Sequence, residues 1–296
     1  MPHPKSIFFL GLISILIMAS CVTQAAVPAF DHVVIVIMEN HAYNEIIGSP
    51  NAPYINNLAT TGVNFTQSYA VSHPSEPNYL AMFSGSTQGV TGDPCPLSFP
   101  GVANLASQLL AAGHSFVGYS EGLPAAGSTA CSSGLYARKH SPWINFDTVP
   151  ASSNQPFSAF PSDYTLLPTL SYVIPNLCND MHNCSIATGD TWLQTNLGGY
   201  VAWSKMHNSL LILTWDEDDA SAGNNIVTIF AGANIVPGSY AETTGHYRML
   251  ATLESMYGLA PLGGAIGLAP ITDIWSQNIF TDGFDGSPPV VDLDLR

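Results

Sequence analysis

Residues 33–40, Val-Val-Ile-Val-Ile-Met-Glu-Asn, form an apolar, mostly β-branched run that ends in a carboxylate and an amide. A continuous apolar run of this length predicts a strand buried on both faces, as is usual in a parallel sheet. Ligands of open parallel sheets bind beyond the carboxyl ends of the strands. Glu39 and Asn40 follow the strand directly, so they are predicted to face a site. The alternative is an ordinary strand end, where Asn40 starts a turn and Glu39 is solvated.

The segments after this strand alternate between helical and extended patterns. Such alternation is typical of an α/β fold with a mostly parallel central sheet flanked by helices. No linker or repeat divides the chain, so one domain is predicted over residues 26–281. The expected elements are strand 31–38, helix 53–59, extended segment 63–71, a helix starting near Pro77, helix 102–112, strand 115–119, a long irregular segment 121–163, strand 170–174, helices 190–196 and 199–206, strands 210–215 and 226–231, and a helix from 245 to about 257.

The first 25 residues have the pattern of a secretory signal peptide. A short basic region precedes a nearly continuous apolar run over residues 7–19, and small residues precede a cleavage point after Ala25. The run is too short to favour a permanent transmembrane helix. A lipobox-like sequence before Cys21 gives a second interpretation, in which this cysteine becomes a lipidated N-terminus. A secreted or periplasmic location is therefore expected, with a lipoprotein as the alternative.

The composition is strongly acidic. The 296 residues include 21 Asp and Glu but only 6 Lys and Arg, which gives a formal net charge of −15. Such a surface repels nucleic acid and anionic membranes, so no nucleic-acid partner is expected. The C-terminal residues 282–296 are polar and acidic, and no structure is predicted for them. An anionic substrate would need the few cations near its site, and Arg138 and Lys139 lie side by side in segment 121–163.

Four cysteines remain after the signal sequence, an even number that suits disulfides in an oxidising compartment. Three pairings are possible. We prefer Cys178–Cys184, which closes a short local loop, together with Cys95–Cys131, which joins two loop regions. A structural zinc site is the other interpretation, but the sequence has no CxxC spacing to support it.

A second predicted buried strand, residues 210–215, ends in the acidic run 216–219. Clustered carboxylates repel one another unless a cation lies between them. Oxygen ligands suit hard divalent ions such as Mg²⁺, Ca²⁺ or Mn²⁺. Metal binding is the favoured interpretation for Asp216 and Glu217, whereas Asp218 and Asp219 are expected to face solvent. The alternative is a solvated acidic loop.

Ser75 is the candidate nucleophile. A helix starting near Pro77 would place this hydroxyl at the positive helix end, where free N–H groups stabilise an alkoxide and bind phosphate oxygens. A metal would lower the hydroxyl pKa further. The alternative is an ordinary helix cap, and sequence spacing does not separate the two. Asn78, three residues later, is a candidate donor to a bound anion.

Four of the nine histidines are predicted at loops or helix starts, where an imidazole can serve as an acid, a base or a phosphate ligand. These are His73, His140, His182 and His246. His32, His114 and His207 are interpreted as structural. A Ser-His-Asp hydrolase is disfavoured because the G-x-S-x-G turn is missing, and no P-loop or dinucleotide fingerprint is present.

Four ordered motifs resemble the bacterial phosphoesterase family of secreted acid phosphatases and phospholipases C, whose fold is alkaline-phosphatase-like. The motifs are Met38-Glu39-Asn40-His41, His73-Pro74-Ser75-Glu76-Pro77-Asn78-Tyr79, Thr214-Trp215-Asp216-Glu217 and Gly245-His246-Tyr247. The resemblance covers residues 31–259. Residues 138–142, 175–176 and 180–182 are similar to the smaller acid-phosphatase branch, which includes phosphatases of phosphoinositides.

The resemblance implies a secreted, metal-dependent phosphatase that hydrolyses phosphomonoesters through a phosphoserine intermediate on Ser75. Its substrate would be a small phosphorylated molecule, with a phospholipid or phosphoinositide headgroup as a further option. The divalent metal, Mg, Ca, Mn or Zn, would be bound by Glu39, Asn40, Asp216 and Glu217. Asp180 would bind metal or orient His182, and His140, His182 and His246 would contact phosphate or protonate the leaving group.

Two alternatives remain open at this point. The phospholipase C branch tends to follow its acidic pair with histidine and glycines, whereas Asp218 and Asp219 follow here. This departure favours a monoesterase over a phosphodiesterase. The other alternative is a non-catalytic secreted Ca²⁺-binding protein, which would leave Ser75 and the histidines unexplained.

Overall fold

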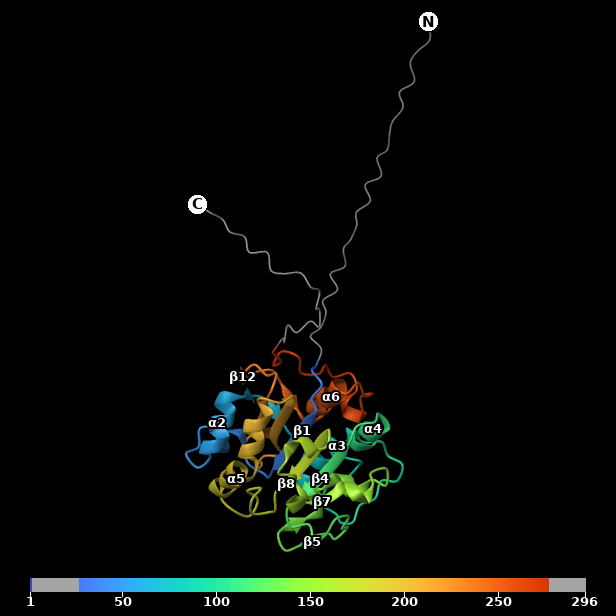
Figure 1. Cartoon of the computed structure of the whole chain (residues 1–296), viewed down its shortest axis with the longest axis vertical. Helices are drawn as coiled ribbons and strands as arrows, with labels where there is room; N and C mark the ends of the chain where they lie inside the picture. The colour runs from blue at the N-terminus through green and yellow to red at the C-terminus, as the bar shows by residue number, and fades with distance from the viewer. Residues whose placement is uncertain (2–26, 277–296) are drawn as a thin grey trace.

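The computed structural model describes Met1 and residues 27–276 (Figure 1). An eight-stranded sheet crosses the molecule, and its strands are parallel to their neighbours except for one strand near the C-terminal end of the sequence. The strands of this sheet are β1 (His32–Met38), β2 (Val63–Phe65), β4 (Phe116–Ser120), β7 (Asn154–Pro156), β8 (Leu170–Ile174), β9 (Ser209–Trp215), β11 (Thr228–Gly232) and β12 (Gly238–Tyr240).

The spatial order of the strands is β12-β2-β11-β9-β1-β8-β4-β7, and β11 runs antiparallel to both β2 and β9. The prediction of a mostly parallel sheet flanked by helices is confirmed. The helices are α1 (Tyr43–Ile46), α2 (Pro53–Thr61), α3 (Ser75–Ser84), α4 (Leu105–Ala111), α5 (Ile186–Ser204) and α6 (His246–Met256). The minor strands are β3 (Ser68–Tyr69), β10 (Asn225–Ile226) and β13 (Thr244–Gly245) in one small sheet, and the hairpin β5 (Ser132–Ser133) with β6 (Tyr136–Ala137).

Strand β1 lies in the middle of the sheet between β8 and β9, so its two faces belong to two apolar cores. Val33, Ile35 and Ile37 pack in the core beneath α3, α4 and α6. Val34, Val36 and Met38 pack in the core beneath α2 and α5, on the opposite face (Figure 1). Each fully buried side chain of this size contributes about 1.5–3 kcal/mol to folding. This double burial explains why the run 33–38 is continuously apolar rather than alternating.

Helix α5 differs from the expectation of two helices over residues 190–196 and 199–206. One helix runs through Gly198 and Gly199, because buried residues before and after the pair keep one face packed on the sheet. The hydroxyl of Tyr164 would lie only 2.7 Å from a Cβ on Gly199. The glycine therefore permits a close contact of the helix and does not interrupt it.

Two other expectations change in detail. The extended segment 63–71 is divided between β2 of the main sheet and β3 of the small sheet. The long segment 121–163 contains the β5–β6 hairpin, the edge strand β7 and short 3₁₀ turns. The 3₁₀ turns within the described residues are η1 (Arg138–His140), η2 (Pro142–Asn145), η3 (Ala151–Ser153), η4 (Phe157–Ala159), η5 (Tyr164–Leu166) and η6 (Gly263–Ala265).

The two disulfides are those preferred from the sequence, Cys95–Cys131 and Cys178–Cys184. The predicted signal peptide, the lipobox at Cys21 and the acidic tail 282–296 lie outside the described residues. Within the described part of the chain, no helix combines the length and the apolarity needed to span a bilayer.

Both ends of the described chain lie at the amino end of β1, as Figure 1 shows. Phe30, just before the strand, packs against Trp275 with ring centroids 5.8 Å apart. Glu39 follows the opposite end of the same strand.

Candidate active site

Three carboxylates meet where the central strands β1 and β9 end. Met38 and Trp215 are register partners, so the residues that follow them, Glu39 and Asp216, emerge side by side. Oxygens of Glu39, Asp216 and Glu217 all lie within 4.8 Å of one another, and all three side chains are buried. The strand ends therefore deliver the acidic groups to one edge, as the sequence predicts. Asn40 follows Glu39 and is half-buried.

Ser75 lies against this cluster. Its Oγ is 3.0 Å from Glu39 Oε2 and 3.2 Å from Glu217 Oε1, and the residue is only 2% exposed. Ser75 is the first residue of α3, two residues before the expected start near Pro77, and its hydroxyl does not cap the helix. The hydroxyl thus points to the carboxylates rather than to the free N–H groups of its own helix.

Asn78 holds the loop that presents Ser75. Its Oδ1 accepts hydrogen bonds from the backbone N–H groups of Val71 and Ser72, at 3.0 and 2.9 Å. Its Nδ2 donates to the carbonyl of Ser72 at 2.9 Å. The amide is fully buried in these contacts. The structure therefore places it as a support of the loop, at a position where the sequence suggests an anion donor.

Glu39 has its own set of partners inside the protein. His140 Nε2 lies 2.9 Å from Glu39 Oε1, and the Tyr79 hydroxyl donates to the same oxygen at 2.8 Å. The two rings stack with centroids 5.0 Å apart. Burial opposes ionisation of Glu39, but His140, Lys139 and Tyr79 outweigh it and lower the pKa to about 2. Glu39 is therefore anionic at every physiological pH.

Asp216 has the opposite environment. Both of its carboxylate oxygens are buried and have no hydrogen-bond partner among residues 27–276. Burial, reinforced by the charges of Glu39 and Glu217, raises its pKa well above the ordinary value. Burial and Glu39 also raise the pKa of Glu217. Unpaired buried carboxylates of this kind are costly unless a cation neutralises them, so the donor set fits a hard divalent ion.

Asp180 and His182 lie on the loop after β8. The backbone N–H of Glu39 donates to the carbonyl of Asp180 at 2.9 Å, so this loop adjoins the cluster. Asp180 Oδ2 is 3.6 Å from His140 Nδ1, and burial followed by the charge of Glu39 raises the pKa of Asp180 to about 9. Asp180 Oδ1 accepts a hydrogen bond from His182 N, and the His182 side chain is exposed. The exposed imidazole of His182 contacts Asn183 Oδ1 through its Nδ1, at 2.8 Å.

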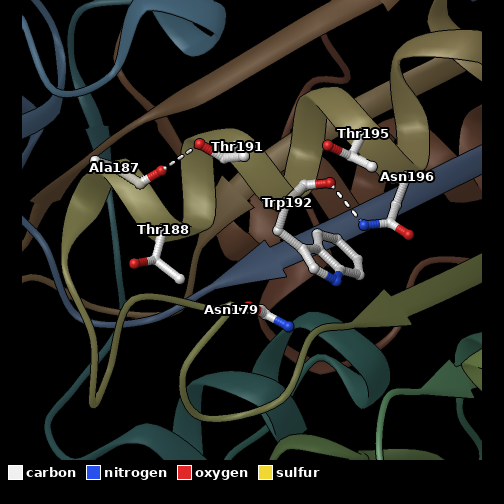
Figure 2. A pocket seen from close by; sticks show the side chains of 7 residues that line it. All are labelled: Asn179, Ala187, Thr188, Thr191, Trp192, Thr195 and Asn196. Carbon is white, nitrogen blue, oxygen red and sulfur yellow. Dashed lines mark hydrogen bonds between the residues drawn. The ribbon is translucent and has the colours of Figure 1, made fainter.

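Glu121, which the sequence analysis does not single out, fixes this loop. Its carboxylate accepts hydrogen bonds from Asn176 N, from Asn179 Nδ2 and from the indole of Trp192 on α5. Figure 2 shows Asn179 and Trp192 beside a surface pocket of about 530 Å³ along α5. The pocket is lined by Asn, Thr, Ala and Trp side chains and has no ionisable group among its lining residues.

His73 and His246 support the acidic strand end. His73 Nδ1 contacts Glu217 Oε2, and its Nε2 lies 3.2 Å from Asp218 Oδ1. His246 Nε2 is 2.6 Å from the backbone carbonyl of Asp216. Burial lowers the pKa of His246 to about 4, so the neutral ring donates to that carbonyl. Nε2 of His246 is therefore engaged with the backbone and is not free for a substrate.

The expectation that Asp218 faces solvent is wrong, whereas Asp219 is exposed as expected. Asp218 is 1% exposed, and its carboxylate accepts backbone hydrogen bonds from Ala220, Ala222 and Asn224. No sequence pattern distinguishes an aspartate that accepts hydrogen bonds from its own loop from one that is solvated. The carboxylate of Asp218 closes the turn that follows Glu217.

The adjacent cations Arg138 and Lys139 point to different places. Arg138 is buried, and its guanidinium donates to the carbonyls of Leu97 and Thr129 and to Asn145 Oδ1. Lys139 Nζ lies 3.5 Å from Ser75 Oγ. Only the lysine of this pair reaches the reactive hydroxyl.

This contrast predicts that substitution of Arg138 affects stability, whereas substitution of Lys139 affects substrate binding. Arg138→Met leaves the buried Asn145 Oδ1 and two part-buried carbonyl oxygens without this donor, and should lower the free energy of unfolding by about 2–4 kcal/mol. Lys139→Met should leave the melting temperature nearly unchanged and raise KM for a phosphate ester. Thermal melting and steady-state kinetics of both variants check this. A large KM effect of Arg138→Met without loss of stability would contradict it.

Asp93 is a further residue beside Ser75 that sequence reasoning does not identify. Its Oδ2 accepts a hydrogen bond from Lys139 Nζ at 2.8 Å, and its Oδ1 accepts one from Glu76 N at 3.0 Å. Burial alone would lower the pKa of Lys139, but the hydrogen bond to Asp93 and the charge of Glu39 raise it. The lysine is therefore fully charged.

Comparisons with known proteins place these features in a family. The sequence model described as Phosphoesterase family matches residues 49–260. The chain is 54% identical over 255 residues to a phosphatidylinositol-3-phosphatase of Mycobacterium tuberculosis, and the match covers 86% of this chain and 85% of that protein. It is 30% identical over 255 residues to an acid phosphatase of Aspergillus fumigatus, covering 79% of this chain and 56% of the longer fungal protein.

A solved structure supports the fold assignment. A protein of the alkaline phosphatase superfamily from Vibrio parahaemolyticus superposes with a TM-score of 0.55 at 14% identity, over 83% of this chain and 72% of that chain. The predicted alkaline-phosphatase-like fold is thereby confirmed.

Proposed function

This chain belongs to the Phosphoesterase family and is a hydrolase of phosphoric esters, and from that premise we propose that it is a metal-dependent acid phosphatase with Ser75 as nucleophile. The observation that carries the proposal is the buried contact of Ser75 Oγ with Glu39 and Glu217. A hydroxyl held among carboxylates is suited to lose its proton only if a cation is also present. We therefore assign the carboxylate cluster and Ser75 to one metal-dependent site.

Glu39, Asn40, Asp216 and Glu217 would hold the divalent ion, with Asp180 as a further ligand or as the residue that orients His182. When bound, the ion would neutralise the carboxylates and favour the ionised form of a nearby hydroxyl. The two unpartnered oxygens of Asp216 support this ligand assignment. The divalent ion would be Mg²⁺, Ca²⁺, Mn²⁺ or Zn²⁺.

In the proposed reaction, Ser75 Oγ gives up its proton to solvent and forms a bond to phosphorus while the bond from phosphorus to the ester oxygen breaks. The departing alkoxide takes a proton from an imidazolium, for which the candidates are the exposed His182 and the buried His140. Water then attacks the phosphoserine and gives a proton to the imidazole that the first step left neutral, and inorganic phosphate leaves as Oγ is released. Lys139 and the positive end of α3 supply positive potential to the phosphoryl oxygens.

The substrate is proposed to be a phosphomonoester, and a phosphoinositide headgroup is one specific candidate. The 54% identity to a protein named phosphatidylinositol-3-phosphatase supports that candidate. Export is proposed as well, because two disulfides suit an oxidising compartment. The non-catalytic Ca²⁺-binding alternative is set aside, since the chain is a hydrolase.

Removal of the metal is the direct test of this proposal. Metal catalysis supplies several kcal/mol of transition-state stabilisation, so exhaustive chelation should lower kcat/KM for 4-nitrophenyl phosphate by at least about a hundredfold. Adding back one of Mg²⁺, Ca²⁺, Mn²⁺ or Zn²⁺ should restore it. A parallel assay with bis(4-nitrophenyl) phosphate should give much slower turnover. Full activity in protein shown to be metal-free would refute the proposal, and faster diester turnover would favour a phosphodiesterase.

A further inference from the structure

Asp93 binds the two groups that are best placed to hold a phosphoryl group beside Ser75. We infer that Asp93 is a positioning residue whose carboxylate competes with phosphate for Lys139 and the α3 N-terminus, and so weakens the binding of substrate and product phosphate. This inference rests on the proposed function of Ser75 and deepens it. It concerns how tightly the site retains inorganic phosphate.

The contacts define the competition. Asp93 Oδ1 accepts from the N–H of Glu76, the residue after Ser75 in the first turn of α3. Such an N–H has no partner within its helix and lies at the positive end of the helix dipole. Asp93 Oδ2 accepts from Lys139 Nζ, which itself lies 3.5 Å from Ser75 Oγ. One carboxylate thus binds the backbone N–H of the residue after Ser75 and a cation that lies 3.5 Å from Ser75 Oγ.

The position of Asp93 is fixed by the chain around it. Asp93 lies two residues before Cys95, and the Cys95–Cys131 disulfide joins this loop to the segment that leads into η1. The N–H of Arg138 donates to the carbonyl of Cys131 at 3.0 Å, next to Lys139. Asp93 and Lys139 therefore lie on two segments that the Cys95–Cys131 disulfide joins.

The negative charge of Asp93 repels an anion that binds at Ser75. A phosphate group bound at Ser75 needs Lys139 and the helix N–H groups as donors, but it is repelled by a carboxylate that already occupies them. Asp93 therefore costs binding free energy in the substrate complex and in the product complex alike. The expected benefit is faster release of phosphate, at the expense of a higher KM.

The alternative role is purely supportive, in which Asp93 orients Lys139 for the substrate. The two roles predict opposite changes. If Asp93 mainly orients the lysine, its removal weakens phosphate binding. If it competes, its removal strengthens phosphate binding.

Asp93→Asn is the discriminating variant, because the amide oxygen can still accept from Glu76 N while the charge is lost. The probe is inorganic phosphate, measured as a competitive inhibitor of 4-nitrophenyl phosphate hydrolysis by the metal-loaded enzyme and as a ligand in calorimetry. An exposed ion pair contributes up to about 1 kcal/mol, so the inhibition constant should fall about fivefold, with KM falling in parallel. An unchanged or increased inhibition constant would overturn the inference.

Two further variants make the result specific. Asp147→Asn removes the same charge from another loop carboxylate, one that accepts from Gly101 N at 2.7 Å, and should change the inhibition constant less than about twofold. In a Lys139→Met background, Asp93→Asn should lose most of its effect; an undiminished effect would overturn the role assigned to Lys139. Wild-type turnover in the same assay tests the proposed function separately, since its absence would reject that function whatever the variants show.

Discussion

Ser75→Ala is expected to lower kcat for a phosphomonoester by on the order of 10⁴- to 10⁶-fold, the scale of loss when a catalytic nucleophile is removed. The hydroxyl lies between Glu39 and Glu217 and no other hydroxyl is described in contact with both carboxylates among residues 27–276. A water molecule that replaced it would lack the covalent route through phosphoserine. The residual rate would reflect only the electrostatic stabilisation left in the site.

Ser72→Ala is the matched control, since Ser72 is in the same loop and its exposed hydroxyl donates only to the carbonyl of His73. It should retain activity within about threefold, as expected for a surface substitution worth less than about 0.5 kcal/mol. Acid quenching of wild type during turnover, followed by mass spectrometry, should find a phosphoryl group on the peptide that contains Ser75. Ser75→Ala with activity close to wild type would exclude this residue as the nucleophile.

Glu39→Gln is expected to abolish metal binding and activity together while the protein still folds. The substitution keeps the shape of the side chain and leaves the apolar body of β1 untouched. Metal at a hundredfold excess over its Kd stabilises a protein by about 2.7 kcal/mol, which for a domain of this size raises the melting temperature by about 5–10 °C. Wild type should show this increase, and the variant should not.

The metal-free proteins give a second, independent comparison. The lowered pKa of Glu39 means that the metal-free fold favours its ionised form, so Glu39→Gln should lower the stability of the metal-free protein as His140 loses its anionic partner. Glu45→Gln serves as the control because Glu45 pairs with His41 on the surface. It should retain both metal content and the metal-induced increase in melting temperature. A Glu39→Gln protein with full metal content would show that the site lies elsewhere.

The sheet and the acidic edge could be predicted from the sequence because their signals are local. A continuous apolar run predicts a central strand, and parallel strands place their carboxyl ends together, so Glu39 and Asp216 were expected at one edge. Ser75 could be placed near a helix start because Pro77 favours the first turn of a helix. Its contact with the carboxylates required knowledge of how α3 docks on the sheet.

The supporting residues could not be predicted because their roles depend on contacts that are distant in sequence. Asp93 meets Lys139 across 46 residues, and Glu121 meets Trp192 across 71. Neighbours in the sequence can also diverge: Arg138 is buried as a structural donor, while Lys139 Nζ lies 3.5 Å from Ser75 Oγ. A pair of adjacent cations does not reveal which of the two turns inward.

The placement of both described chain ends at the amino end of β1 has a practical consequence. Seven residues of strand separate that end from Glu39, a span of about 23 Å. A bead, a resin or a fused protein joined at either end of segment 27–276 would therefore be attached at the end of β1 opposite to the proposed site. Enzyme immobilised in this way should keep the proposed site directed to the solution, with the same KM for a small ester whichever end carries the attachment.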